Sequence, residues 1–114
     1  MADTYDIEID AGATFQLQAL WKDSDGDPIN LTGYSARMHI RRTVEADDID
    51  VELTSGSGIT LGGTAGTIDI EINDATTSGL SGEYVYDLEL ESGGGVVSRV
   101  IQGAVTVIPE VTRE

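Results

Sequence analysis

The sequence contains no cysteine, one histidine, two prolines and few aromatic residues. Without cysteine the chain can form neither a disulfide nor a thiolate metal site. The single histidine has no second imidazole with which to share a metal ion. No apolar run approaches the ~20 residues that span a bilayer as a helix. These absences exclude a disulfide scaffold and a cysteine–histidine zinc site. We therefore expect the protein to bind no metal and no other cofactor.

Basic residues are also scarce, with six Lys and Arg against 21 Asp and Glu, which gives a net charge of −15 in 114 residues. A field of this sign repels nucleic acid and anionic membrane surfaces, so we expect neither as a partner. The chain is 39% hydrophobic in a regular pattern, which indicates a folded acidic domain rather than a disordered one. The first residues lack a basic stretch followed by an apolar run, so we expect no secretory signal and synthesis in a cytoplasm.

Apolar and polar residues alternate with period two along most of the chain, which is typical of strands with one buried face. The alternation predicts strands at 5–10, 15–21, 34–41, 51–54, 58–61, 68–72, 84–91 and 96–108. It shifts at Gly103, which indicates a bulge or bend. Residues 74–80 read as one short helical turn capped by Asn73 or Asp74. Seven or eight short strands at this spacing predict an all-β, antiparallel β-sandwich or small barrel.

We assign residues 1–114 to a single domain with an N-terminal arm at 1–9 and a C-terminal tail at 109–114. The strand faces predict the members of the core. These are Ile7, Phe15, Leu17, Trp21, Tyr34, Met38, Ile40, Ile68, Ile70, Tyr86, Leu88 and Val105.

The stretch DSDGD at 23–27 raises the question of a calcium loop. If Asp23, Asp25 and Asp27 took the first three ligand positions of an EF-hand loop, Pro28 would stand where a glycine is needed and Tyr34 where the bidentate glutamate belongs. A hairpin needs only Asp25-Gly26 between two strands. We therefore interpret the stretch as a turn, with a weak cation site as the alternative.

No catalytic constellation is evident, so we expect neither an enzyme nor a small-molecule substrate. The acidic residues of the strands fall on alternate, solvent-facing positions, where carboxylates form a solvated face. His39 falls on the polar face of its strand without a partner for metal binding.

Basic residues gather on one strand, and this is the candidate protein interface. Arg37, His39 and Arg41 share a face of the strand, and Arg42 follows them. One interpretation is cross-strand pairing with acidic residues on a neighbouring strand. The other is a basic stripe that docks on an acidic patch of another copy or of a partner. Both remain open from the sequence.

The turn DPINLTGY at 27–34, together with the strand ARMHIR at 36–41 after it, resembles small structural proteins of tailed phages and prophages. Further along, the order and spacing of several segments also resemble these proteins, and the likeness covers about residues 10–110. The segments are 58–61, 66–68, 80–88, Arg99 and 103–107. The chain is similar as well to the N-terminal domain of upper baseplate proteins, which attach tail fibres.

The resemblance implies an immunoglobulin-like β-sandwich that acts without enzymatic activity as a virion component of the tail, baseplate or fibre-attachment region. It implies other virion proteins as partners and, as an option, copies of the chain itself. It also implies the virion as location after synthesis in the host bacterial cytoplasm. The alternatives are a capsid cement or decoration protein and a module that binds host glycans. A glycan module needs an exposed aromatic platform, yet most aromatic residues fall on core faces, with Tyr5 as the candidate for exposure.

Overall fold

A computed structural model describes residues 3–111 of the protein. In chain order the elements are β1 (Asp3–Thr4), β2 (Ile7–Asp10), β3 (Phe15–Leu20), β4 (Ser35–Arg41), β5 (Val51–Ser55), β6 (Gly58–Leu61), the 3-10 turn η1 (Gly63–Ala65), β7 (Thr67–Ile72), α1 (Asp74–Thr77), β8 (Gly82–Glu91) and β9 (Val97–Ile108). Each expected strand has a counterpart, and the expected all-β class is confirmed.

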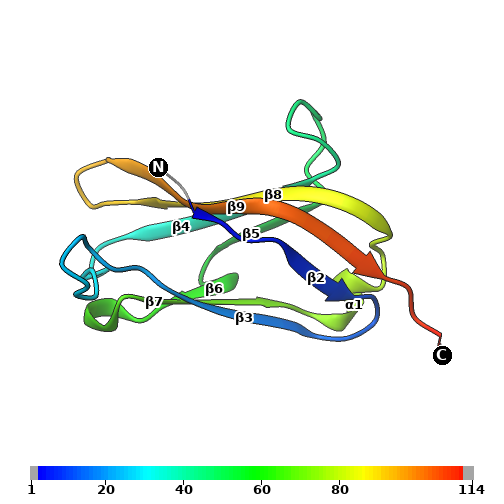
Figure 1. The fold of residues 1–114 in the computed structure, drawn as a ribbon, viewed down its shortest axis with the longest axis horizontal. Coiled ribbons are helices and arrows are strands. Elements are labelled where there is room, and N and C mark those ends of the chain that lie inside the picture. The colour runs from blue at the N-terminus through cyan, green and yellow to red at the C-terminus, as the bar shows by residue number, and fades with distance from the viewer. Residues whose placement is uncertain (1–2, 112–114) are drawn as a thin grey trace.

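The strands form one hydrogen-bonded path that folds over into two layers (Figure 1). The path runs β1-β9-β8-β4-β5-β6-β7-β3, and β2 also pairs with β9. Only two residue pairs, Thr54 with Gly58 and Ser55 with Ile59, join β5 to β6. The sheet turns over at this junction, so that β9, β8, β4 and β5 form one layer and β6, β7 and β3 form the other (Figure 1).

The strand order within the layers is that of an immunoglobulin-like sandwich. In that fold the fourth, fifth and second strands form one sheet, and the third, sixth and seventh strands form the other. In this protein the first of these sheets is formed by β6, β7 and β3, in that order. The second is formed by β4, β8 and β9, and it has an additional strand, β5, beside β4. The first strand departs from this scheme, because β1 and β2 lie beside β9 instead of β3.

The core lies between the two layers. Eight of the twelve expected core residues are buried: Ile7, Met38, Ile40, Ile68, Ile70, Tyr86, Leu88 and Val105. Phe15, Leu17, Trp21 and Tyr34 are only half-buried, and they pack against the margin of the core. Phe15, Leu17 and Trp21 are less buried than the other eight because they lie on β3 or directly after it, at the end of the strand path.

The expected antiparallel pairing holds for most neighbouring strands but not for all of them. β1 and β2 pair with β9 in parallel, as do β5 and β6. The described residues contain nine strands instead of seven or eight, because the expected first strand is interrupted at Tyr5 and Asp6. At this break the Asp6 carboxylate accepts a hydrogen bond from the backbone N–H of Ala104 at 3.0 Å. The Asp6 side chain thus takes the place of a backbone carbonyl as the hydrogen-bond acceptor between the N-terminal segment and β9.

The expected N-terminal arm at 1–9 is wrong for the described residues 3–9. Ile7 and Ile9 are buried in the core, and Ile7–Asp10 pair with Val105–Ile108 of β9. Met1 and Ala2 lie outside the described residues. Of the expected tail at 109–114, residues 109–111 follow β9 without strand structure and Val111 is exposed, whereas 112–114 lie outside the described residues.

The irregularity expected at Gly103 lies three residues earlier. Leu88 pairs with Ile101 and Glu89 with Arg99, so Val100 is the extra residue of a β-bulge. This explains why the consecutive residues Val100 and Ile101 are both buried. Gly103 has another role, because a Cβ atom there would lie 2.4 Å from the backbone oxygen of Tyr5. The absence of a side chain at 103 lets the N-terminal strand approach β9.

The short helix α1 closes the end of the sandwich. As expected, Asn73 caps it, with its side-chain oxygen accepting a hydrogen bond from the N–H of Thr76 at 2.8 Å. Thr77 is fully buried, and its hydroxyl donates to the carbonyl of Ala13 at 2.8 Å and accepts from the N–H of Gly12 at 3.1 Å. The helix therefore fixes the turn between β2 and β3. In residues 3–111 no helix has the length and apolar character needed to cross a membrane.

A pair of neighbouring substitutions tests whether the N-terminal strand belongs to the sandwich. Ile9→Ala removes a fully buried side chain and is expected to lower the free energy of unfolding by about 2–5 kcal/mol. Glu8→Gln on the exposed side of β2 is the matched control and is expected to change it by less than about 0.5 kcal/mol. Denaturant unfolding measures both. Equal stabilities of the two variants would contradict the placement of β2.

Candidate functional site

The basic residues expected to form an interface lie on β4, whose outward side chains include Arg37, His39 and Arg41. Arg37 is placed opposite Glu89 of β8, and His39 is placed between Glu52 of β5 and Asp87 of β8. The Arg37 guanidinium Nε donates to the Glu89 carboxylate at 2.9 Å, and this hydrogen bond raises the pKa of Arg37 above its usual range. Cross-strand pairing with acidic neighbours is therefore present on β4.

His39 and Arg41 continue the same column of side chains. His39 Nε2 lies 3.2 Å from the Glu52 carboxylate, and its Nδ1 lies 3.3 Å from an Arg41 nitrogen. Arg41 also donates to the backbone carbonyl of Ala46 at 2.7 Å. Arg41 thereby holds the loop of residues 42–50, which projects away from the sandwich between β4 and β5 (Figure 1).

Arg42 does not join this column. Its guanidinium carbon lies 4.0 Å from the centre of the Tyr84 ring, and Nη1 donates to the carbonyl of Glu83 at 3.2 Å. Because side chains alternate between the two faces of a strand, residue 42 points away from the face that carries Arg37 and Arg41. Its side chain instead stabilises the start of β8 by a cation–π contact. The structure thus brings three of the four proposed interface residues together.

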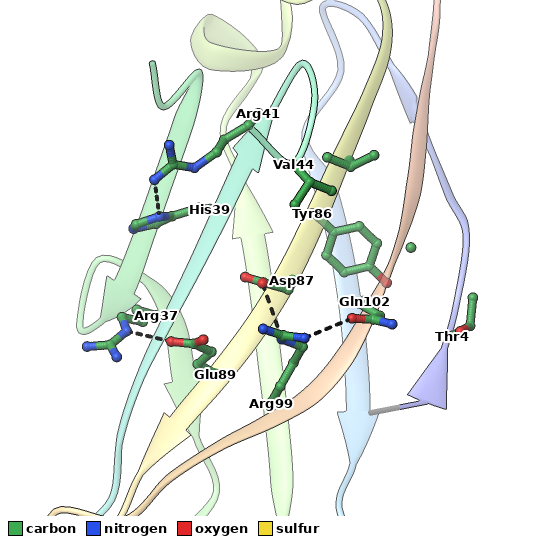
Figure 2. A pocket seen from close by; sticks show the side chains of 12 residues that line it. Thr4, Arg37, His39, Arg41, Val44, Tyr86, Asp87, Glu89, Arg99 and Gln102 are labelled. Atoms are coloured by element: carbon green, nitrogen blue, oxygen red, sulfur yellow. Dashed lines mark hydrogen bonds and ion pairs between the residues drawn. The ribbon is translucent and has the colours of Figure 1, made fainter. Parts of the chain in front are cut away.

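Sequence reasoning missed Arg99 as a member of the site. Arg99 Nε on β9 lies 3.4 Å from the Asp87 carboxylate, and its Nη1 lies 3.4 Å from the side-chain oxygen of Gln102. Figure 2 shows Arg99 between these two partners, on the same face as Arg37 and His39. The bulge at Val100 hid this residue, because it breaks the alternation that would have assigned Arg99 to the outer face.

Together these side chains form what we call the striped face: columns of alternating charge across four adjacent strands. Its members are Glu52 on β5; Arg37, His39 and Arg41 on β4; Asp87, Glu89 and Glu91 on β8; and Arg99 and Gln102 on β9. The face carries three of the six Lys and Arg residues of the chain but only four of its 21 acidic residues. It is nearly neutral on a molecule of net charge −15.

A hollow opens on the striped face, and most charged members of the face line it together with Gln102 (Figure 2). Thr4, Val44, Val85, Tyr86 and Gly103 complete the lining. Its charged groups are already engaged with each other, as in the Arg37–Glu89 and Arg99–Asp87 pairs.

The aspartates of DSDGD form a turn, as expected. Asp23 closes it, with its N–H bonded to the carbonyl of Asp27 and its carboxylate accepting from the N–H groups of Asp25 and Asp27 at 2.9 and 3.0 Å. Gly26 has a φ of 86°, a conformation that favours glycine. Among residues 3–111, no group of three or more His, Asp or Glu side chains is placed to hold a metal ion.

No protein-family model matches the sequence, and no curated protein matches it. Among solved structures, the fold is similar to that of the extracellular domains of the voltage-gated sodium channel beta4 subunit, whose parallel homodimers are described as explaining a role in cell–cell adhesion. The likeness covers 97% of this chain and 96% of that chain, with 13% sequence identity and a TM-score of 0.46. A likeness of this degree carries no statement about function.

Calcium titration tests the turn. Because the Asp23 carboxylate already accepts two backbone N–H groups, we expect millimolar calcium and millimolar magnesium to shift the melting temperature equally, through screening of the negative charge. Thermal unfolding in each ion measures this. A stabilisation by calcium alone that is lost in Asp25→Ala would contradict the interpretation as a turn.

Tyr86 below the striped face gives a prediction at high pH. Burial, together with the nearby Tyr5 and Asp6, raises the pKa of Tyr86 from 10.0 to about 12, and its hydroxyl donates to the carbonyl of Tyr5. The neutral phenol therefore stabilises the folded state fully below pH 10, and this contribution disappears as the pH rises through about 12.

Ultraviolet titration of the four tyrosines measures this prediction directly. We expect one tyrosine to ionise near pH 12 and that component to be absent in Tyr86→Phe. A titration curve that Tyr86→Phe leaves unchanged in shape would contradict the assignment.

Proposed function

We propose that the protein is a non-enzymatic structural component of a bacteriophage virion, in the tail, baseplate or fibre-attachment region, and that it acts through protein–protein contacts. The observation that carries the proposal is the striped face. Its alternating charges lie on four paired strands of one layer, on a molecule whose remaining surface repels other acidic proteins.

The ion pairs of the striped face are suited to exchange partners on docking. Side-chain exposure is 48% for Arg37, 43% for Glu91 and 52% for Arg99. Exposed pairs of this kind contribute about 0–1 kcal/mol each, so replacing one with a pair across an interface costs little. Arginine adds directional recognition of carboxylates through its planar fork. The face can therefore recognise a partner surface with a complementary order of charges.

The motifs that resemble phage structural proteins build this same face. The turn at 27–34 leads into β4, where Tyr34 N donates to the carbonyl of Leu31 and the following strand presents Arg37, His39 and Arg41 outward. The sequence likeness and the candidate interface thus concern one segment of the chain. This supports a role in which β4 contacts other virion proteins after synthesis in the host bacterial cytoplasm.

A capsid cement or decoration protein would use the same kind of face, so location within the particle separates it from a tail component. The glycan-binding alternative has less support. Among the described residues, Tyr5 is the only aromatic side chain that is largely exposed, at 51%. Trp21 and Tyr34 pack edge to face against each other at the margin of the core, with ring centres 6.1 Å apart.

Charge reversal on the striped face tests the proposal. We expect the wild-type chain in purified virions and a loss of incorporation of at least about tenfold for Arg37→Glu. The reversal places a like charge against the partner's carboxylates, which costs more than the about 1.4 kcal/mol that corresponds to a tenfold change. Lys22→Glu, which makes the same change of charge on the exposed turn beside β3, is the matched control and is expected to incorporate normally. Quantitative mass spectrometry of virions measures both.

Melting curves of both variants separate a loss of docking from a loss of folding. Arg37 is half-exposed, so we expect Arg37→Glu to fold. Absence of the wild-type chain from virions would contradict the proposed function, and equal incorporation of the two variants would show that attachment uses another surface.

A further inference from the structure

The outer edge of β3 lacks a strand neighbour among residues 3–111. β3 pairs with β7 only, at the end of the strand path. Trp21, directly after β3, donates its N–H to Gly66, directly before β7. Hydrogen bonding alternates along an antiparallel pair, so the odd-numbered residues of β3 bond to β7. Gln16, Gln18 and Leu20 therefore turn their backbone N–H and C=O groups to the open side.

Natural proteins usually protect such an edge, and β3 lacks the usual devices. Edge strands are commonly protected by charged side chains, prolines, bulges or a covering segment. Residues 14–21, TFQLQALW, contain no charge and no proline, and β3 pairs with β7 without a register shift. At the other end of the path, the strands β1 and β2 are short, are interrupted at Tyr5 and Asp6, and carry Asp3, Glu8 and Asp10. The edge of β3 is thus the uncharged one.

The side chains on the inner face of β3 are incompletely covered. Phe15, Leu17 and Ala19 are only half-buried, whereas Ile72, Ile70 and Ile68, which oppose them on β7, are 0–1% exposed. An additional strand beside β3 would cover these apolar side chains and satisfy the open backbone groups at the same time. Strand addition to an exposed sheet edge is a common mode of association.

We propose that β3 pairs antiparallel with β3 of a second copy of the chain, around a two-fold axis at Leu17. In this register Leu17 faces Leu17 of the second copy, Gln16 faces Gln18, and Phe15 faces Ala19. The large side chain of Phe15 thus meets the small side chain of Ala19. The unpaired backbone N–H and C=O groups of Gln16 and Gln18 face each other and can form hydrogen bonds. The two β6-β7-β3 layers become one six-stranded sheet.

The glutamine side chains fit this register. Gln16 Nε2 donates to Glu71 at 2.9 Å, and Gln18 Nε2 donates to Asp69 at 2.8 Å. Each amide keeps a second N–H donor and its oxygen acceptor. Gln16 of one copy and Gln18 of the other can therefore bond across the new strand pair. The hydrogen bonds to the carboxylates of β7 hold both amides on the outer face of β3, so the bond across the new strand pair uses the second donor or the oxygen of each amide.

Charge explains why a second copy is tolerated at this edge. The acidic side chains of the two β7 strands would be separated by three strand spacings, or about 14 Å. The Debye length is about 8 Å at physiological ionic strength and about 30 Å at 0.01 M. Repulsion between the copies is therefore screened at physiological salt and strong at low salt. Association through β3 strengthens as salt is added, whereas docking through the ion pairs of the striped face weakens.

A six-residue edge gives a small interface, so the dimer is weak unless copies are held at high local concentration. We expect a dissociation constant between about 10 µM and about 1 mM, as in transient complexes that bury less than about 1,200 Å². Sedimentation equilibrium at about 0.01 M and about 0.15 M salt measures the constant and its direction of change with salt. Gln18→Pro removes the outward N–H group together with the side-chain hydrogen bond to Asp69, and it is expected to prevent the dimer. Arg37→Glu, on the other layer, is expected to leave the dimer unchanged at about 0.15 M salt, where the added charge is screened.

Cross-linking tests the register itself. The chain has no cysteine, so Leu17→Cys carries a single thiol. In the proposed register the two introduced thiols lie directly opposite each other, with Cα atoms about 4.5 Å apart, a separation that a disulfide can bridge. Leu20→Cys is the matched control. Leu20 is 48% exposed and so is more accessible than Leu17, which is half-buried. In the proposed register, however, residue 20 of one copy would lie about 20 Å along the strands from residue 20 of the other.

We expect Leu17→Cys to form the disulfide-linked dimer at least about tenfold faster than Leu20→Cys under oxidised glutathione, because only the former meets disulfide geometry. Equal or faster linking of Leu20→Cys, or a wild-type chain that stays monomeric at about 1 mM in physiological salt, would overturn the proposal. If the protein is absent from virions, the proposed function fails while this dimer test stands by itself.

Discussion

The parallel pairing of the N-terminal strand with β9 is the constraint on which the rest of the structure depends. It places Ile7 and Ile9 in the core and closes the layer that carries the striped face. It requires glycine at 103, where the backbone of Tyr5 approaches β9, and it accounts for the hydrogen bonds that Asp6 and Tyr86 make at the break between β1 and β2. Because one strand cannot cover two edges, the same pairing leaves β3 without a second strand neighbour among residues 3–111.

Charge divides the surface into regions with different possibilities for association. A net charge of −15 keeps copies apart wherever acidic side chains dominate. Two regions escape this repulsion for different reasons. On the striped face, arginines compensate the carboxylates of neighbouring strands, and on the edge of β3 the side chains carry no charge at all. The two surfaces belong to different layers of the sandwich, so a copy paired through β3 still presents its striped face to another protein.

Sequence periodicity predicted the strands and the all-β fold because each strand has one face in the core. It predicted Met38, Ile40, Ile70 and Leu88 as buried for the same reason. It did not predict which strands pair. The alternation of Tyr5, Ile7 and Ile9 fits a strand in either layer. Periodicity therefore predicts neither the direction of the first strand nor its neighbour, and an arm at 1–9 is equally compatible with it. Burial of Phe15 and Leu17 was overestimated because period two does not distinguish an edge strand from a central one.

The candidate site was predictable in part. Spacing on one strand assigned Arg37, His39 and Arg41 to a common face, since side chains two residues apart point the same way. The acidic columns on both sides depend on cross-strand register, which no local pattern encodes. Arg99 was hidden by the bulge at Val100, and Arg42 was grouped with its neighbours by sequence proximity although it stacks on Tyr84 instead.

Amide hydrogen exchange of the dilute protein at low salt tests the central claim most directly. If β2 occupies the edge of β9 and β3 is open, the amides of β2 that bond to β9 exchange slowly, and protection alternates along β3. Leu17 and Ala19 are then protected by their bonds to β7, while Gln16 and Gln18 exchange rapidly. Uniform protection along β3 together with rapid exchange throughout β2 would contradict the account, because it would place the N-terminal strand on the other layer.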